Sequence, residues 1–263
     1  GSVFGFAKVD MTTPEHLKSL YADFPPIIKH AEVGRNDIGE FMKNYAIRTG
    51  KLKAPRQNLI SSYCAKDEVL STEMIRFLVN HGILLDKVHE VFQYDRSRPF
   101  EAFRDKVTKH RQEADQDPSL AMIADTFKLL GNTGYGKTLT NKESHMDVFY
   151  ADYQKAAESS LSPYIKKIKY IGNNCYEVHM RKKEIVMDLP IVVGLSVYNW
   201  AKIRMLEFFY DVLQKYIDPA DDQCMQTDTD SIYLALSADN LIDIVKPELR
   251  REFAQIYPNW FVT

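Results

Sequence analysis

The segment at 117–138 constrains the fold most, because a helical pattern runs directly into a glycine-rich octapeptide. Asp117 followed by Pro118 is a strong helix start, since the aspartate caps the first turn and the proline fits its first position. The octapeptide GNTGYGKT, residues 131–138, satisfies the phosphate-loop pattern G-x-x-x-x-G-K-[ST]. A phosphate loop needs a buried strand before it and an amphipathic helix after it. Here a helix precedes the glycine-rich turn, and the polar stretch LTNKESHMD follows it. Because neither flank has the required structure, a phosphate-loop NTPase is only our third hypothesis for the function.

The same helix carries a polar stripe. Lys128, Asn132 and Tyr135 stand at i, i+4 and i+7, which places them on one helix face. An ammonium group, an amide and an aromatic ring can together bind a nucleotide, through phosphate contact, hydrogen bonding and stacking. An ordinary solvated helix face is the alternative for this stripe taken alone. The face expected to pack into the core consists of Ile123, Phe127 and Leu130.

A second polar cluster, TDTDS at 227–231, lies inside a predicted hairpin at 225–236. Asp228 and Asp230 are two residues apart, so their carboxylates lie on the same side of a strand or converge across a turn. Like charges this close are costly unless a cation neutralises them. Oxygen ligands in a turn suit Mg²⁺, and two such ions support in-line phosphoryl transfer. A plain acidic hairpin turn is the alternative.

The composition excludes several classes of protein. With 45% hydrophobic and 27% charged residues the chain is neither disordered nor fibrous. The 34 basic and 36 acidic side chains give a net charge of −2, so a polyanion would have to be bound by local patches or metal ions. Three widely spaced cysteines favour a reducing, intracellular compartment without disulfides. The longest apolar run, 189–201, is shorter than the roughly 18 residues of a membrane span, and we expect no membrane partner.

Helices and strands are mixed along the chain without βαβ alternation, which predicts the α+β class. Strands are expected at 3–11, 83–94, 146–150, 175–180 and 184–188, and helices at 37–50, 72–81, 99–114 and 192–217. The segment 43–56 carries five basic residues and no acidic one, so it is either a solvated loop or a phosphate or acidic-partner contact.

The two polar clusters in this order resemble a known pair of motifs. KLLGNTGYG at 128–136 is similar to the fingers motif K-x-x-x-N-S-x-Y-G of family B DNA polymerases. TDTDS at 227–231 resembles their palm motif Y-x-D-T-D-S, and VYNWAKIRMLEF at 197–208 is similar to the helix before it. The spacing resembles the protein-primed branch, and the Polinton/Maverick self-synthesising transposons look closest. The likeness runs from about residue 3 to the end of the chain.

The resemblance implies a DNA-directed DNA polymerase, a nucleotidyltransferase that adds dNTPs to the primer of a DNA primer–template. Asp228 and Asp230 would be catalytic ligands of Mg²⁺ in a two-metal site. Lys128 and Arg111 would contact the incoming triphosphate, and Asn132 and Tyr135 would line the nascent base pair. The family would act in the nucleus or at a viral replication site.

The resemblance also implies a division of the chain. Residues 1–98 would hold a palm edge strand and the first insertion of the protein-primed branch, and 142–188 would be the second insertion. One insertion contacts the terminal priming protein in this family, and the other helps to encircle DNA. The fingers helices would occupy 99–141, and 189–263 would be the palm with its acidic hairpin.

The sequence departs from the family pattern at several points. Thr133 replaces the motif serine, and Gln226 stands where the palm motif has tyrosine. The first palm motif, D-x-x-S-L-Y-P, is missing; the nearest string, at 16–26, has His16 in the aspartate position. The chain opens with Gly1 and Ser2, which resembles a cloning remnant, and we expect the motif upstream of it. We therefore expect the isolated chain to be inactive unless another acid, such as Asp10 or Asp23, completes the metal site.

A second hypothesis has the same fold without catalysis, as a remnant that binds nucleic acid or a protein partner. The absent third carboxylate favours this for the isolated chain but not for a longer parent.

Overall fold

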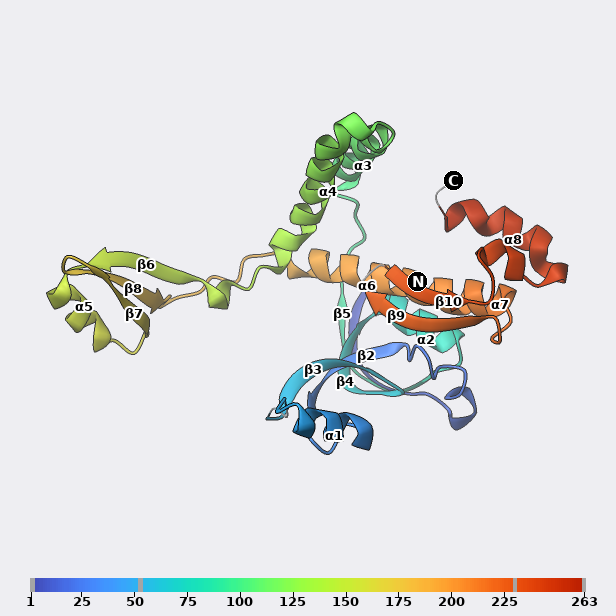
Figure 1. The fold of residues 1–263 in the computed structure, drawn as a ribbon, viewed down its shortest axis with the longest axis horizontal. Helices are drawn as coiled ribbons and strands as arrows, with labels where there is room; N and C mark the ends of the chain where they lie inside the picture. Colours follow the sequence, from blue (N-terminus) through green and yellow to red (C-terminus); the bar gives the residue numbers. More distant parts are fainter. Residues whose placement is uncertain (1–2, 52–53, 229–230, 262–263) are drawn as a thin grey trace. The chain divides into compact units, whose positions relative to one another are not determined.

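The computed structural model describes residues 3–51, 54–228 and 231–261, and it confirms the α+β class (Figure 1). All its sheets are antiparallel. The chain divides into two compact units, unit 1 with residues 1–97 and 198–263 and unit 2 with residues 98–197. No helix in the described residues is long and apolar enough to cross a membrane.

Unit 1 contains a three-stranded sheet of order β4-β1-β5 and two separate two-stranded ribbons, β2-β3 and β9-β10. The strands are β1 (Gly5–Thr12), β2 (Ile27–Val33), β3 (Arg56–Ser62), β4 (Cys64–Ser71), β5 (Leu84–Gln93), β9 (Asp222–Asp228) and β10 (Ser231–Leu236). The helices are α1 (Glu40–Arg48), α2 (Thr72–Asn80), α7 (Gln214–Tyr216) and α8 (Arg250–Ile256). The helix α6 (Ile191–Glu207) begins in unit 2 and continues into unit 1, where a π-helical segment, Phe208–Leu213, joins it to α7.

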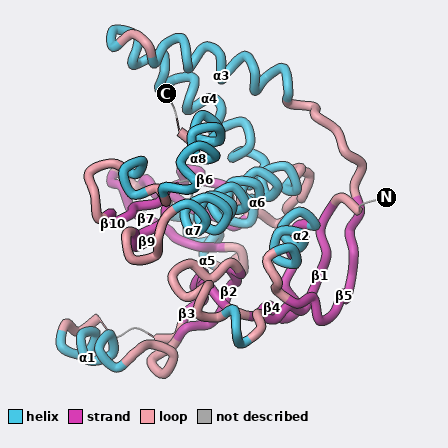
Figure 2. Tube along the Cα trace, turned by 90° about the vertical axis from the view of Figure 1, so that its right-hand side faces the viewer, coloured by secondary structure: helices cyan, strands magenta, loops and turns pink. Residues whose placement is uncertain are grey.

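Unit 2 combines a helical hairpin with a small sheet, coloured by element type in Figure 2. Its helices are α3 (Glu101–Asp115), α4 (Ala121–Gly136) and α5 (Tyr153–Ser160), and its strands are β6 (Met146–Ala151), β7 (Ile165–Gly172) and β8 (Cys175–Arg181). The short 3₁₀ turns at Pro118–Leu120 and Lys137–Leu139 flank α4. The sheet has the order β6-β8-β7, and α5 lies against it over the buried Val178.

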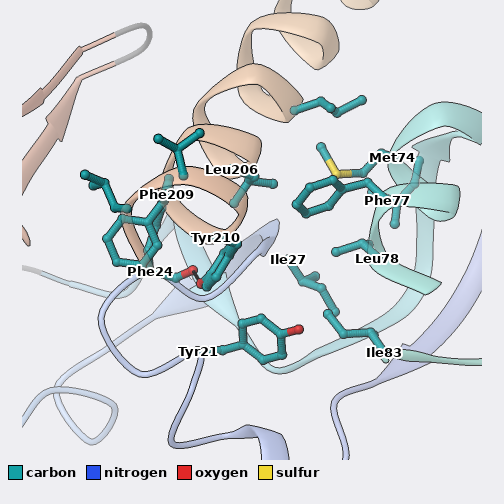
Figure 3. Close-up of a cluster of buried hydrophobic side chains, with 14 of the residues drawn as sticks. Tyr21, Phe24, Ile27, Met74, Phe77, Leu78, Ile83, Leu206, Phe209 and Tyr210 are labelled. Carbon is teal, nitrogen blue, oxygen red and sulfur yellow. Dashed lines mark hydrogen bonds between the residues drawn. The ribbon is translucent and has the colours of Figure 1, made fainter. Parts of the chain in front are cut away.

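The core of unit 1 forms around the end of α6 and the π-helical segment (Figure 3). Leu206 is completely buried there, and the ring of Phe209 packs edge-on against Phe24, 5.5 Å between centroids. Tyr210 packs edge-on against Tyr21 at 5.0 Å, and its hydroxyl donates to the carbonyl of Phe24. Burial of Tyr210 raises the pKa of its hydroxyl well above the usual value, so the group stays neutral and acts as a donor.

Several local predictions are confirmed because they rest on strong local signals. Ser71 caps α2 by accepting from the Met74 amide, and Gly82 follows the helix with φ of +83°, which glycine adopts without strain. Asp117 caps the turn before α4 by accepting from the Ser119 amide.

One strand of the sheet in unit 2 lies elsewhere than predicted. The third strand of its sheet is β7, which includes the lysine-rich stretch at 166–169, while 184–188 forms no strand. A strand is recognised by alternation of apolar and charged residues, and the adjacent Lys166 and Lys167 interrupt this alternation in β7. The register of β7 with β8 also shifts at this point, between Ile165 and Lys167.

The packing face of α4 also differs from the expected one. Ile123 and Leu130 are each nearly half exposed, while Ala124 is buried and Phe127 is half-buried. Of the expected residues, Phe127 does contact α3, and Gly131 and Gly134 continue the contact, where the lack of a side chain lets the two helices approach closely.

Candidate functional site

The helical hairpin of α3 and α4 carries four of the six candidate residues, and Figures 1 and 2 both show its helices side by side. Three pairs connect the helices along their length: His110 with Phe127, Val107 with Gly131, and Phe103 with Gly134. The His110 and Phe127 rings stack, with centroids 5.0 Å apart and planes 23° apart. A Cβ atom on Gly131 would lie 3.3 Å from the Val107 side chain, so glycine allows the close approach. These pairs fix an antiparallel register.

That register turns the candidate residues toward one side of the hairpin. Each of them follows a contact residue by one position: Arg111 follows His110, Lys128 follows Phe127, Asn132 follows Gly131, and Tyr135 follows Gly134. One residue rotates an α-helix by about 100°, and in antiparallel helices this step turns both side chains to the same side of the pair. Arg111 and Lys128 also lie at the same level, since their preceding residues are stacked partners.

The two cations differ in their surroundings. Arg111 is about half exposed, and its Nε lies 3.5 Å from the Asp115 carboxylate one helical turn later. Lys128 is exposed and forms no ion pair with any residue of the described parts of the chain. The hairpin therefore offers one unpaired ammonium and one guanidinium held by a weak, exposed ion pair.

Tyr135 borders a cavity of about 560 Å³ within unit 2. Its walls are mostly apolar and include Phe100, Phe103, Val107, Val193 and Val197. Tyr135 is half-buried, so neighbouring atoms support part of its side chain, as a stacking platform requires.

The glycine-rich octapeptide does not form a phosphate loop. Residues 131–136 belong to α4, which ends at Gly136, and a 3₁₀ turn follows. No described strand leads into this segment. Its backbone amides are part of a helix interior, so they do not surround an anion.

The predicted acidic hairpin is present, as β9 and β10. Asp228 is exposed at the end of β9, opposite Ser231 in the register. Ile232 and Leu234 alternate toward the core and hold the ribbon in place. Asp230, the other predicted ligand, lies outside the described residues. Gln226 is exposed, so the position where the palm motif has tyrosine makes little demand on packing here.

Asp23, one of the two acids near the N-terminus that were considered as a third ligand, lies at the far end of β9 from Asp228. Asp23 lies beside Asp221 and Asp222. The pKa of Asp222 is raised mainly by its own burial and next by the negative charge of Asp23. Asp222 and Asp228 begin and end β9, so about 20 Å of strand separates them. Asp10 lies beside Asp67 of β4 and His89 of β5, and no local pattern in the sequence predicts these neighbours because they come from two distant strands.

No protein-family model, curated protein or solved structure matches the chain.

Proposed function

We propose that this chain carries the nucleotide-binding fingers and part of the palm of a protein-primed family B DNA polymerase, in the manner of the Polinton/Maverick elements. The reaction is transfer of a nucleotide from a dNTP to a primer 3′-hydroxyl on a DNA template. The motif resemblance supports this class of reaction, and the α3–α4 hairpin adds physical support.

The register of α3 with α4 carries the proposal, because it turns Arg111 and Lys128 to one side of the hairpin at about the same level. A triphosphate binds best to converging cations, because each charge-assisted hydrogen bond is about twice as strong as a neutral one. Asn132 and Tyr135 continue along the same side, toward the end of α4. An extended nucleotide therefore fits with its phosphates at the cations and its base near the tyrosine ring.

The exposed carboxylate of Asp228 fits the role of a magnesium ligand. Mg²⁺ prefers oxygen ligands and keeps several waters, so an exposed carboxylate at the end of a strand suits it. Asp230 would be the second ligand from this hairpin. When bound, the ions would supply the charge that activates the primer hydroxyl and stabilises the departing pyrophosphate.

The proposal assigns partners to the insertions. The segments around 12–98 and 142–188 would contact a terminal priming protein and DNA. Within the second of these, β7 places Lys166, Lys167 and Lys169 on a strand, which concentrates positive charge in a chain whose net charge is −2.

Binding of dNTP in the presence of Mg²⁺ tests the hairpin assignment. Lys128→Ala and Arg111→Ala should each weaken binding at least about tenfold, because hydrogen bonds to charged groups contribute roughly 1.5–3 kcal/mol. The measurement is a dissociation constant from titration of the folded chain with a fluorescent dNTP.

Lys109→Ala is the matched control. Lys109 precedes His110, so it lies on the opposite side of the same helix, where it pairs with Glu113 at 3.8 Å. Removal of this charge should leave the dissociation constant nearly unchanged. Equal losses for Lys109→Ala and Lys128→Ala would indicate unspecific attraction and contradict the assignment.

Asp115→Asn should strengthen dNTP binding by up to about fivefold. The Asp115 carboxylate competes with phosphate for Arg111, and exposed ion pairs of this kind contribute roughly 0.2–1 kcal/mol. The same titration measures the effect, and the gain should vanish in the Arg111→Ala background. A gain that persists there would show that Asp115 acts through its general charge.

A further inference from the structure

Three strands of unit 1 bring a histidine and two aspartates to one point. In the sheet β4-β1-β5, Asp10 comes from β1, Asp67 from β4 and His89 from β5. The His89 Nε2 atom lies 2.9 Å from Asp10 Oδ1 and 3.5 Å from Asp67 Oδ1. All three donor atoms are within 4.8 Å of one another, and no other group of three such residues in the described parts of the chain is this close.

Irregular strand pairing creates this convergence. The register of β1 with β4 shifts between Val9 and Met11, and its register with β5 shifts between Lys8 and Val9. Each shift inserts an extra residue opposite β1, which re-aims side chains relative to a regular ladder. The Asp67 amide donates to Asp10 Oδ1 at 2.8 Å and thereby fixes the orientation of that carboxylate.

The separations agree with the edges of a small coordination polyhedron. Zn²⁺ binds nitrogen and oxygen donors at about 2.0–2.1 Å, so neighbouring ligands in a tetrahedron are about 3.3 Å apart. The distances of 2.9 and 3.5 Å lie on either side of that value. One imidazole and two carboxylates suit Zn²⁺ or Mn²⁺ better than Ca²⁺, which takes six to eight oxygens.

We propose that Asp10, Asp67 and His89 bind a divalent transition-metal ion, with water in the remaining position. The side chains of Asp10 and His89 are about a quarter exposed and that of Asp67 is half exposed, so an ion has access from solvent. The site is independent of the proposed polymerase function and ties together the three strands of the sheet.

Nearby charges set the conditions for binding. The Asp67 amide and His89 are the main causes that keep the pKa of Asp10 below its usual value, so this ligand is ionised at neutral pH. Lys8 Nζ lies 3.2 Å from Asp67 Oδ1 and competes with a metal for that oxygen.

Lys8→Gln should therefore strengthen metal binding.

Calorimetric titration of the folded chain with Zn²⁺, in buffer containing excess Mg²⁺, tests the site. We expect one equivalent to bind, and His89→Gln, Asp10→Asn and Asp67→Asn each to weaken it at least tenfold. Co²⁺ is the spectroscopic probe, and its visible absorption should show nitrogen and oxygen ligands without thiolate bands. Near-ultraviolet circular dichroism establishes that each variant is folded.

His81→Gln is the matched control, because His81 Nε2 lies 2.8 Å from Asp211 Oδ1 but belongs to no group of three ligands among the described residues. Its replacement should leave Zn²⁺ affinity unchanged. Absence of Zn²⁺ binding, a cobalt spectrum with thiolate bands, or full affinity in His89→Gln would each overturn the proposal. Equal losses in the His81 and His89 variants would do the same.

Discussion

Replacement of Lys202 by methionine should raise the free energy of unfolding at pH 7 by about 3 kcal/mol. Lys202 lies on α6 and is largely buried, which lowers the pKa of its amine from 10.5 to about 8, although the carboxylate of Glu68 partly opposes the shift. Each pKa unit corresponds to about 1.36 kcal/mol between the two protonation states. Methionine keeps most of the volume of the side chain and removes the charge.

The pH dependence follows from the direction of this shift. Below pH 8 both the folded and unfolded chains bind the proton, so the full cost of burying the charge is present. Between pH 8 and 10.5 the unfolded chain binds more protons than the folded one, so stability should rise with pH. Denaturant unfolding across this range should show the rise in the wild type and a flatter profile in Lys202→Met.

Two further variants serve as controls for Lys202. Lys215 is exposed, and its hydrogen bond to Glu252 raises the pKa of its amine, so Lys215→Met should bring no gain in stability at pH 7. Glu68→Gln should lower the pKa of Lys202 further, because it removes the opposing charge. A wild-type stability that is flat from pH 8 to 10.5 would show that Lys202 is charged and hydrated.

The sequence predicted elements whose signals are local. The Ser71 cap, the Asp117 start of the α4 region and the β9-β10 hairpin all depend on neighbours within a few residues. The stripe of Lys128, Asn132 and Tyr135 followed from helical spacing alone, and the structure adds that Arg111 is on the same side. The position of Arg111 depends on the register between α3 and α4, and the periodicity of a single helix carries no information about that register.

Features that depend on distant segments were missed. Ile123 and Leu130 were expected in the core because they are apolar, but Phe127 and two glycines, Gly131 and Gly134, form the contact of α4 with α3. The group of Asp10, Asp67 and His89 joins three strands through two register shifts. Apolar pattern and motif spacing describe single elements, whereas these features arise from how elements pair.

Replacement of Gly194 by alanine should lower the free energy of unfolding by about 3 kcal/mol. Within unit 2, a Cβ atom on Gly194 would lie 2.4 Å from Leu139 Cγ and 2.6 Å from Thr138 Oγ1. Overpacking of this kind costs roughly 1–3 kcal/mol. Loss of the hydrogen bond from the Gly194 amide to the buried Thr138 hydroxyl, 3.1 Å long, adds roughly 1 kcal/mol.

The same variant should also affect nucleotide binding, because Thr138 connects two helices. Its hydroxyl donates to the carbonyl of Tyr135 at 2.6 Å while accepting from Gly194 on α6, so displacement of Thr138 moves the end of α4. Gly136→Ala is the control, since a Cβ there meets no atom within 4 Å and alanine stabilises a helix by roughly 0.5–1 kcal/mol over glycine. Denaturant unfolding and dNTP titration of both variants should therefore give opposite changes in stability, with weaker dNTP binding in Gly194→Ala alone. Wild-type stability in Gly194→Ala would mean that α6 does not pack against the 137–139 turn, and the support that this turn gives to Tyr135 would have to come from α3.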